Sequence, residues 1–213
     1  MKKIIDNSLK YVKEVFKSDY SGHDYFHTYR VYKLATQIAK KENANVEIVQ
    51  LAALLHDVDD RKLSPETYKN KDKTRTFLLE NNVDETTINT ICEIIEEVSY
   101  KGKDSVVPTT IEGKCVQDAD RLDAIGAIGI ARAFAYGGSH NQVIHNPDVP
   151  PKLNLSEEEY RRHVSTTINH FYEKLLNLSE LMTTETAKKM ANSRENFMKE
   201  YLLRFMDEWE GII

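Results

Sequence analysis

Residues 46–57 read VEIVQLAALLHD, and this stretch decides the fold class. Its first ten residues are mostly apolar, and the last two are a histidine and an aspartate. The alanine and leucine content favours a helix over a strand, and the density of apolar residues predicts that most of this helix is buried. We therefore expect residues 46–55 to form a central helix that ends at His56 and Asp57.

Helical periodicity continues on both sides of this stretch. Apolar residues recur every three or four positions in 5–16, in 31–38 and after a predicted N-cap at Asp84. Residues 111–136 are interpreted as one long helix that ends at Gly137 and Gly138. Ser156 and Glu159 form a capping box for another helix, whose apolar positions run from Tyr160 to Leu175. Thr183 or Thr184 begins the last helix, which reaches about Trp209.

These patterns predict an all-α, single-domain helical bundle over residues 1–213. A short β-prone run, 105–111, contains Pro108, so no sheet is expected. The Gly126 and Gly129 pair lies inside a predicted helix, which favours close helix packing over nucleotide binding. The loop at 137–155 is long for a compact domain and is either an active-site flap or a crossover.

Composition limits the functional classes. The 213 residues carry 29 Lys and Arg against 34 Asp and Glu, a formal charge of -5, which argues against a duplex nucleic-acid surface. Cys92 and Cys115 are too few for a disulfide framework, and no stretch is long and apolar enough to span a membrane. We expect a cytoplasmic protein, with a homodimer as a candidate assembly.

Polar side chains capable of metal binding recur beside apolar helix faces: His27, His56, Asp57 and Asp120. A buried carboxylate is costly unless it is paired, neutralised or bound to a cation. A single inward histidine is more often a hydrogen-bonded core residue, but together the four favour a metal site. Two imidazoles and two carboxylates suit one divalent ion, Mn, Fe, Co, Ni or Mg, with positions left open for catalysis.

The segments HDYFHTYRV (23–31), LLHD (54–57) and DADRLDAIG (118–126) resemble the signature of the HD superfamily of metal-dependent phosphohydrolases. YGGSHNQVIHNP (136–147) and residues 169–191 extend the resemblance to small stand-alone bacterial HD hydrolases. The signature covers about 23–125, and C-terminal helices follow at about 156–210. The resemblance implies an all-helical fold, His27, His56, Asp57 and Asp120 as ligands, and hydrolysis of a small nucleotide, with a nucleoside or deoxynucleoside triphosphate as first choice.

Further roles are predicted around these ligands. Asp60 is the preferred residue to handle the proton of water, and Asp59 is the alternative, although the segment 57–62 could instead be a solvated turn. The candidates for contact with substrate phosphate are Arg30, Lys62, Lys101, Lys114 and His23. Asp123 and Asp24 are expected to orient ligands or complete the polar network. His140 and His145 lie in the long loop and are less favoured candidates for closing over the phosphate.

The sequence lacks certain residues and motifs, and their absence argues against some classes of enzyme. No histidine lies between Asp57 and Asp120, which argues against the binuclear HD phosphodiesterases and the HD-type diiron oxygenases and favours one metal ion. A P-loop is absent as well. Two alternatives stay open: a hydrolase of guanosine tetraphosphate type alarmones, and a metal-stabilised nucleotide sensor without turnover.

Overall fold

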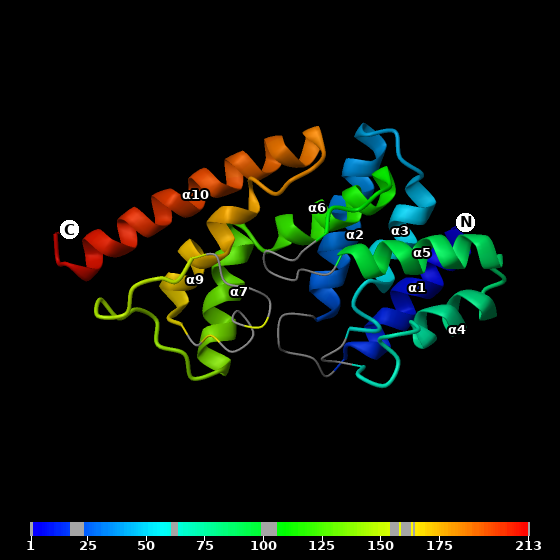
Figure 1. Cartoon of the computed structure of the whole chain (residues 1–213), viewed down its shortest axis with the longest axis horizontal. Coiled ribbons are helices and arrows are strands. Elements are labelled where there is room, and N and C mark those ends of the chain that lie inside the picture. Colours follow the sequence, from blue (N-terminus) through cyan, green and yellow to red (C-terminus); the bar gives the residue numbers. More distant parts are fainter. Residues whose placement is uncertain are drawn as a thin grey trace. The chain divides into compact units, whose positions relative to one another are not determined.

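The computed structural model describes residues 2–17, 24–60, 64–98, 106–153, 158, 163 and 165–212. All regular elements within these ranges are helices, so the predicted all-α class is confirmed (Figure 1). The described chain divides into two compact units: an N-terminal unit of residues up to 98 together with 106–120, and a C-terminal unit from 121 onward. One domain over 1–213 stays a prediction.

The N-terminal unit contains α1 (Lys2–Val15), α2 (Tyr25–Lys41), α3 (Val46–Leu55), α4 (Asp72–Glu80), α5 (Glu85–Val98) and most of α6 (Ile111–Asp123). The predicted central helix is α3. It packs against α1, α2 and α5, and its residues from Leu51 to Leu55 are buried. Asn45 caps α3 by accepting the backbone N–H groups of Glu47 and Ile48, which fixes where the helix begins. The helix ends at Leu55, and His56 is its C-cap.

The sequence patterns missed α4. Its sequence, DKTRTFLLE, is short and polar, and only Thr74, Phe77 and Leu78 are buried. Lys71 precedes it in the left-handed conformation, and its side chain makes no capping hydrogen bond. The carboxylate of Asp59 instead accepts the backbone N–H groups of Lys73 at 3.2 Å and Thr74 at 2.9 Å. Helix α4 therefore depends on a capping group from a distant part of the sequence.

The C-terminal unit contains α7 (Gly126–Ser139), α9 (Thr167–Glu173), the 3₁₀ helix η2 (Leu175–Leu178) and α10 (Glu185–Trp209). Helix α7 packs against α9 and α10. The predicted last helix is confirmed, with Thr184 as its N-cap. Ser156 and Glu159 lie outside the described residues, but His163, Ser165 and Thr166 are not helical, so the expected continuous helix from 156 into 175 was wrong.

The long helix expected over 111–136 is also wrong, because the chain breaks at Ala124 and Ile125 between α6 and α7. Gly126 follows the break at φ +76, a backbone conformation that side chains rarely adopt. A Cβ at Gly129 would overlap the carbonyl oxygen of Ala124, so this glycine allows the turn to fold back closely. The helix then continues through Gly137 and Gly138 to Ser139.

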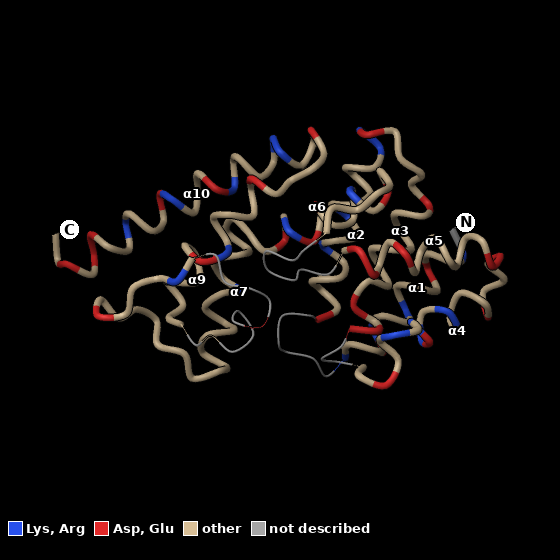
Figure 2. The backbone as a smooth tube through the Cα atoms, in the orientation of Figure 1, with Lys and Arg blue, Asp and Glu red and all other residues tan. Residues whose placement is uncertain are grey.

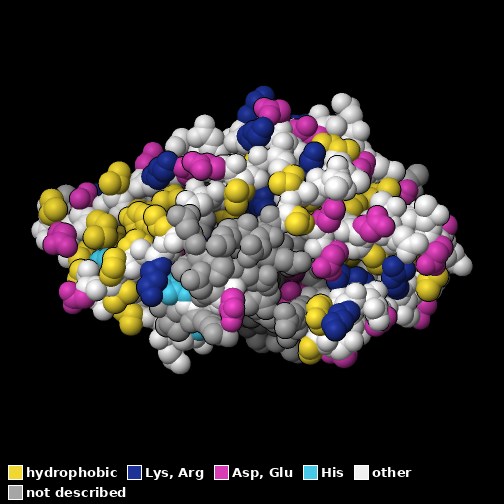
Figure 3. All heavy atoms as spheres, in the orientation of Figure 1, with side chains coloured by type: hydrophobic (Ala, Val, Ile, Leu, Met, Phe, Trp, Pro, Cys, Tyr) yellow, Lys and Arg dark blue, Asp and Glu magenta, His cyan; other side chains and the backbone are white. Residues whose placement is uncertain are grey.

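Basic and acidic residues are interspersed along the described backbone, α10 included, rather than gathered by sign (Figure 2). Large apolar side chains are exposed in the C-terminal unit, among them Val143, Ile144, Trp209 and Ile212. Figure 3 shows apolar side chains gathered over the C-terminal part of α10. In the described ranges, no helix combines the length and the apolar character needed to cross a bilayer.

Candidate metal centre

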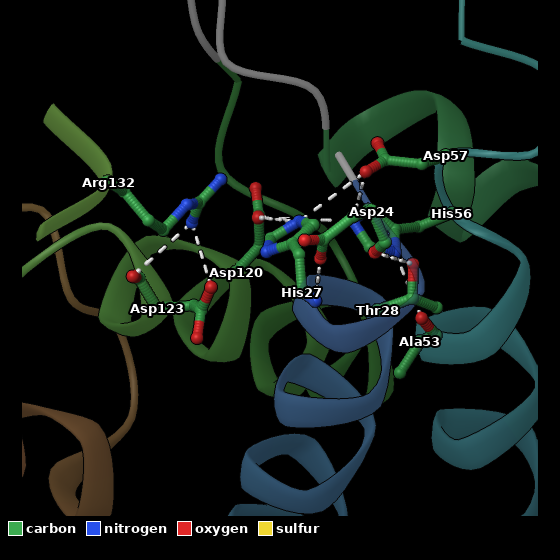
Figure 4. A network of polar contacts seen from close by, with 9 residues as sticks. All are labelled: Asp24, His27, Thr28, Ala53, His56, Asp57, Asp120, Asp123 and Arg132. Carbon is green, nitrogen blue, oxygen red and sulfur yellow. Dashed lines mark hydrogen bonds and ion pairs between the residues drawn. The ribbon is translucent and has the colours of Figure 1, made fainter. Parts of the chain in front are cut away.

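The first turn of α2 positions His27. Asp24 is the N-cap of this helix, and its Oδ1 accepts the backbone N–H of His27 at 2.7 Å (Figure 4). Its backbone oxygen accepts the N–H of Thr28 at 3.2 Å. Asp24 therefore fixes the backbone that carries His27, which gives the predicted supporting residue a definite structural role.

The end of α3 positions His56 and Asp57. Nδ1 of His56 lies 2.9 Å from the backbone oxygen of Ala53, so this nitrogen donates a hydrogen bond. Nε2 then carries the lone pair in the neutral ring, and this atom is buried and makes no hydrogen bond within the described ranges. The Ala53 carbonyl thus orients His56 with a basic nitrogen toward the acidic residues, a role that the sequence patterns did not indicate.

All four predicted ligands come together within the N-terminal unit (Figure 4). Nε2 of His27 lies 3.4 Å from Oδ2 of Asp57 and 3.4 Å from Oδ1 of Asp120. Nε2 of His56 lies 3.3 Å from the same oxygen of Asp57 and 3.9 Å from that of Asp120. Residues from α2, from the turn after α3 and from α6 therefore share one small polar cluster.

Burial and charge make this cluster attractive to a cation. His27, His56 and Asp57 are all buried, whereas the side chain of Asp120 is 29% exposed. Burial lowers the pKa of His56, but the negative charges of Asp57 and Asp120 and the hydrogen bond to Ala53 outweigh it, and the pKa rises to about 9. Among these four residues, Asp120 has the side chain most accessible to solvent.

The donor set fits a divalent ion. Candidate ligand atoms of His27, His56 and Asp57 lie within 4.8 Å of one another, and Asp120 adds an oxygen next to both histidines. Neighbouring ligands of an ion with bonds of about 2.1 Å are separated by roughly 3 Å, close to the distances found. The buried Nε2 of His56 supplies a nitrogen ligand that forms no hydrogen bond in the described part of the chain.

The two candidate proton acceptors occupy different settings. Asp59 is 2% exposed, and its two carboxylate oxygens accept the backbone N–H groups of α4 described above. Asp60 is only partly buried, and its backbone N–H donates to the oxygen of Asp57 at 3.1 Å. Asp60 is thus attached to the turn that carries a predicted ligand, whereas Asp59 stabilises a helix start.

The candidate phosphate-binding residues are only partly brought together. Arg30 lies on α2 one turn beyond His27 and is partly exposed. Lys114 lies on α6 six residues before Asp120, which is about 9 Å along the helix and about 120° around it. It therefore does not share the face of α6 that carries the ligand. His23, Lys62 and Lys101 lie outside the described residues.

Asp123 belongs to the C-terminal unit and is 1% exposed. Its Oδ2 lies 2.8 Å from Nη1 of Arg132, a pair that the sequence patterns missed because the break in the long helix was not foreseen. His140 stacks on Tyr136, and His145 meets Trp209 edge to face at 4.8 Å. Both loop histidines thus make aromatic contacts within their own unit.

The N-terminal unit therefore combines an all-helical fold with a cluster of two histidines and two aspartates that can hold a metal ion. The HD domain model matches residues 24–125, and we conclude that the chain belongs to the HD superfamily. An uncharacterized protein of Bacillus subtilis, YpgQ, is 35% identical over 204 residues, which cover 95% of this chain and 92% of YpgQ.

Solved structures show the same fold. An HD-superfamily hydrolase from Bacillus thuringiensis is 39% identical, with a TM-score of 0.78 over 98% of both chains. A structure of Bacillus subtilis YpgQ in complex with ADP is 36% identical, with a TM-score of 0.75 over 96% of both chains. The HD-type helical fold predicted from the sequence is thereby confirmed.

Proposed function

We propose that this protein is a metal-dependent phosphohydrolase that cleaves a nucleoside or deoxynucleoside triphosphate. The observation that carries the proposal is the cluster of His27, His56, Asp57 and Asp120, with nitrogen-to-oxygen distances of 3.3–3.9 Å. Membership of the HD superfamily supports hydrolysis, and the ADP complex of YpgQ supports a nucleotide as ligand. One ion is preferred, because no histidine lies between Asp57 and Asp120 to supply the further ligands of a binuclear site.

His27, His56, Asp57 and Asp120 would hold the divalent ion. When bound, such an ion lowers the pKa of water and offsets negative charge on phosphate. The residues around it then have to orient the substrate and accept the proton released by water. Asp120 is the partly exposed member of the set, so the substrate approaches from its side.

Asp60 is the residue proposed to accept that proton. The oxygen of water bonds to phosphorus, the bond from phosphorus to the leaving-group oxygen breaks, and the proton of water passes to the carboxylate of Asp60. The hydrogen bond between the Asp60 N–H and the Asp57 oxygen supports this role, because it holds Asp60 near a ligand. Arg30 would pair with phosphate oxygens through its planar guanidinium group.

The test is a screen of the full chain after removal of bound metal with a chelator. Mn²⁺, Fe²⁺, Co²⁺, Ni²⁺ or Mg²⁺ is added back, and the release of phosphate and of pyrophosphate is measured for nucleoside and deoxynucleoside triphosphates. We expect turnover that depends on added metal and that Asp57→Ala abolishes. Turnover that persists in Asp57→Ala would reject the proposed centre.

The same screen separates the alternatives. A guanosine tetraphosphate type alarmone is included, and hydrolysis of that compound alone would favour the alarmone hydrolase. Binding of nucleotide without turnover under every metal would favour the sensor. The identity of the released product distinguishes removal of pyrophosphate from stepwise loss of phosphate.

A further inference from the structure

Phe26 precedes His27 on the first turn of α2, and its residue surface is 64% exposed. The other aromatic residues of α2, Tyr25, Tyr29 and Tyr32, are all partly buried. Phe26 thus presents an exposed apolar ring one residue before a proposed metal ligand. The neighbouring side chains determine whether this ring is suited to binding a ligand.

The ring of Phe26 has support from one side. Tyr25 contacts it edge to face, with ring centroids 5.4 Å apart and an interplanar angle of 68°. Tyr25 in turn stacks on Tyr29 at 6.0 Å, and the ammonium group of Lys13 lies 5.9 Å from the centroid of its ring. Phe26 is therefore held by an aromatic row along α2 while much of its own surface stays open to solvent.

The geometry of α2 also relates Phe26 to the predicted phosphate contact. An α-helix turns about 100° per residue, so Arg30 lies about 60° from His27 and about 40° from Phe26 around the helix axis. A metal ligand, a guanidinium group and an aromatic ring thus follow one another around one side of α2. A nucleotide carries matching groups, since its phosphates need cations and its base offers a flat π surface.

We propose that Phe26 is the residue on which the base of a bound nucleotide stacks. This inference rests on the proposed function and deepens it. Stacking on an aromatic side chain is tolerant of base identity, because every base has a π face. The protein should therefore bind nucleotides more tightly than inorganic phosphate chains, with little discrimination among bases.

The test compares ADP with inorganic pyrophosphate, which has the phosphates but no base. Dissociation constants are measured by calorimetry in Mn²⁺ for the full chain and for Phe26→Ala. We expect Phe26→Ala to weaken the binding of ADP about tenfold and to leave that of pyrophosphate within about twofold. Phe197→Ala is the control, because Phe197 is 48% exposed but lies on α10 in the other unit, and both affinities should stay unchanged.

Phe26→Trp provides a second measurement, tryptophan fluorescence, which does not depend on loss of affinity. The chain has a single tryptophan, Trp209, whose signal is measured in the unsubstituted protein and subtracted. ADP should bind to Phe26→Trp as tightly as to the unsubstituted protein and should quench the new fluorescence, whereas pyrophosphate should not. Equal loss of both ligands in Phe26→Ala, or unchanged ADP binding, would overturn the stacking role alone. If the unsubstituted protein binds pyrophosphate but not ADP, the proposed nucleotide substrate fails and the stacking role fails with it.

Discussion

Nε2 of His27 lies 3.4 Å from Oδ1 of Asp120, although one residue belongs to α2 and the other to α6. Asp120 is also the most exposed of the four proposed ligands. A residue in this position can contribute to metal binding without supporting the buried core around His27. A substitution at Asp120 can therefore change metal binding without changing the stability of the metal-free protein.

Asp120→Ala should weaken the binding of Mn²⁺ by about 10-fold or more, because it removes an oxygen next to both histidines. The measurement is calorimetric titration of the metal-free chain. Thermal unfolding without metal should change little. Asp148→Ala is the control, because it removes an exposed aspartate from the C-terminal unit, and it should bind Mn²⁺ as the unsubstituted protein does. Equal metal affinity in Asp120→Ala and the control would remove Asp120 from the ligand set.

Asp59 and Asp60 are adjacent, but substitution of Asp59 should mainly lower stability and substitution of Asp60 should mainly lower kcat. Asp59→Ala leaves two backbone N–H groups of α4 without their acceptor, so it should lower the free energy of unfolding by about 1 kcal/mol or more. Asp60→Asn should lower kcat about 100-fold with little change in stability. Urea unfolding, kcat and Mn²⁺ affinity are measured for both variants. An unchanged kcat in metal-loaded Asp60→Asn would exclude it as the proton acceptor.

These two aspartates show where sequence reasoning reached its limit. The four proposed ligands could be picked out from the sequence because their types, their apolar neighbours and the resemblance to HD hydrolases agree, and the structure brings them together. The role of Asp59 could not, because it depends on the backbone of Lys73 and Thr74, which the chain brings back to it only in the folded structure. Without that cap, the polar sequence of α4 gives little sign of a helix.

The break between α6 and α7 was not predicted for the same reason, because it depends on the folded backbone. Residues 111–136 contain no proline, and their apolar pattern continues across Ala124 and Ile125. The break is determined by the left-handed backbone of Gly126 and by the close approach of Gly129 to the Ala124 carbonyl group. Glycine in a helical pattern indicates close packing or a turn equally well, so its conformation had to come from the structure.

Gly129→Ala should destabilise the protein by about 2 kcal/mol, because the added methyl group overlaps a backbone oxygen that cannot rotate away. Gly138→Ala is a matched control on the same helix, since a Cβ there has no neighbour within 4 Å. It should be neutral or stabilising by up to about 1 kcal/mol, as alanine favours helix. The midpoint of urea unfolding measures both. Similar midpoints for the two variants would contradict the close turn.

His170 on α9 should make stability depend on pH. Burial, followed by the charge of Lys174, lowers the pKa of His170 from 6.5 to about 4 in the folded protein. As the pH falls below about 6.5, the unfolded chain binds a proton at this residue while the folded chain does not, so unfolding becomes more favourable down to about pH 4. The stabilisation is thus fully present above pH 6.5 and is lost on acidification.

We expect His170→Gln to have a flatter dependence of the urea midpoint between about pH 7 and pH 5, whereas His140→Gln, at an exposed histidine, should follow the unsubstituted protein. If the urea midpoints of His170→Gln and of the unsubstituted protein change with pH in parallel, His170 binds a proton equally well in the folded and the unfolded protein, and the prediction is wrong.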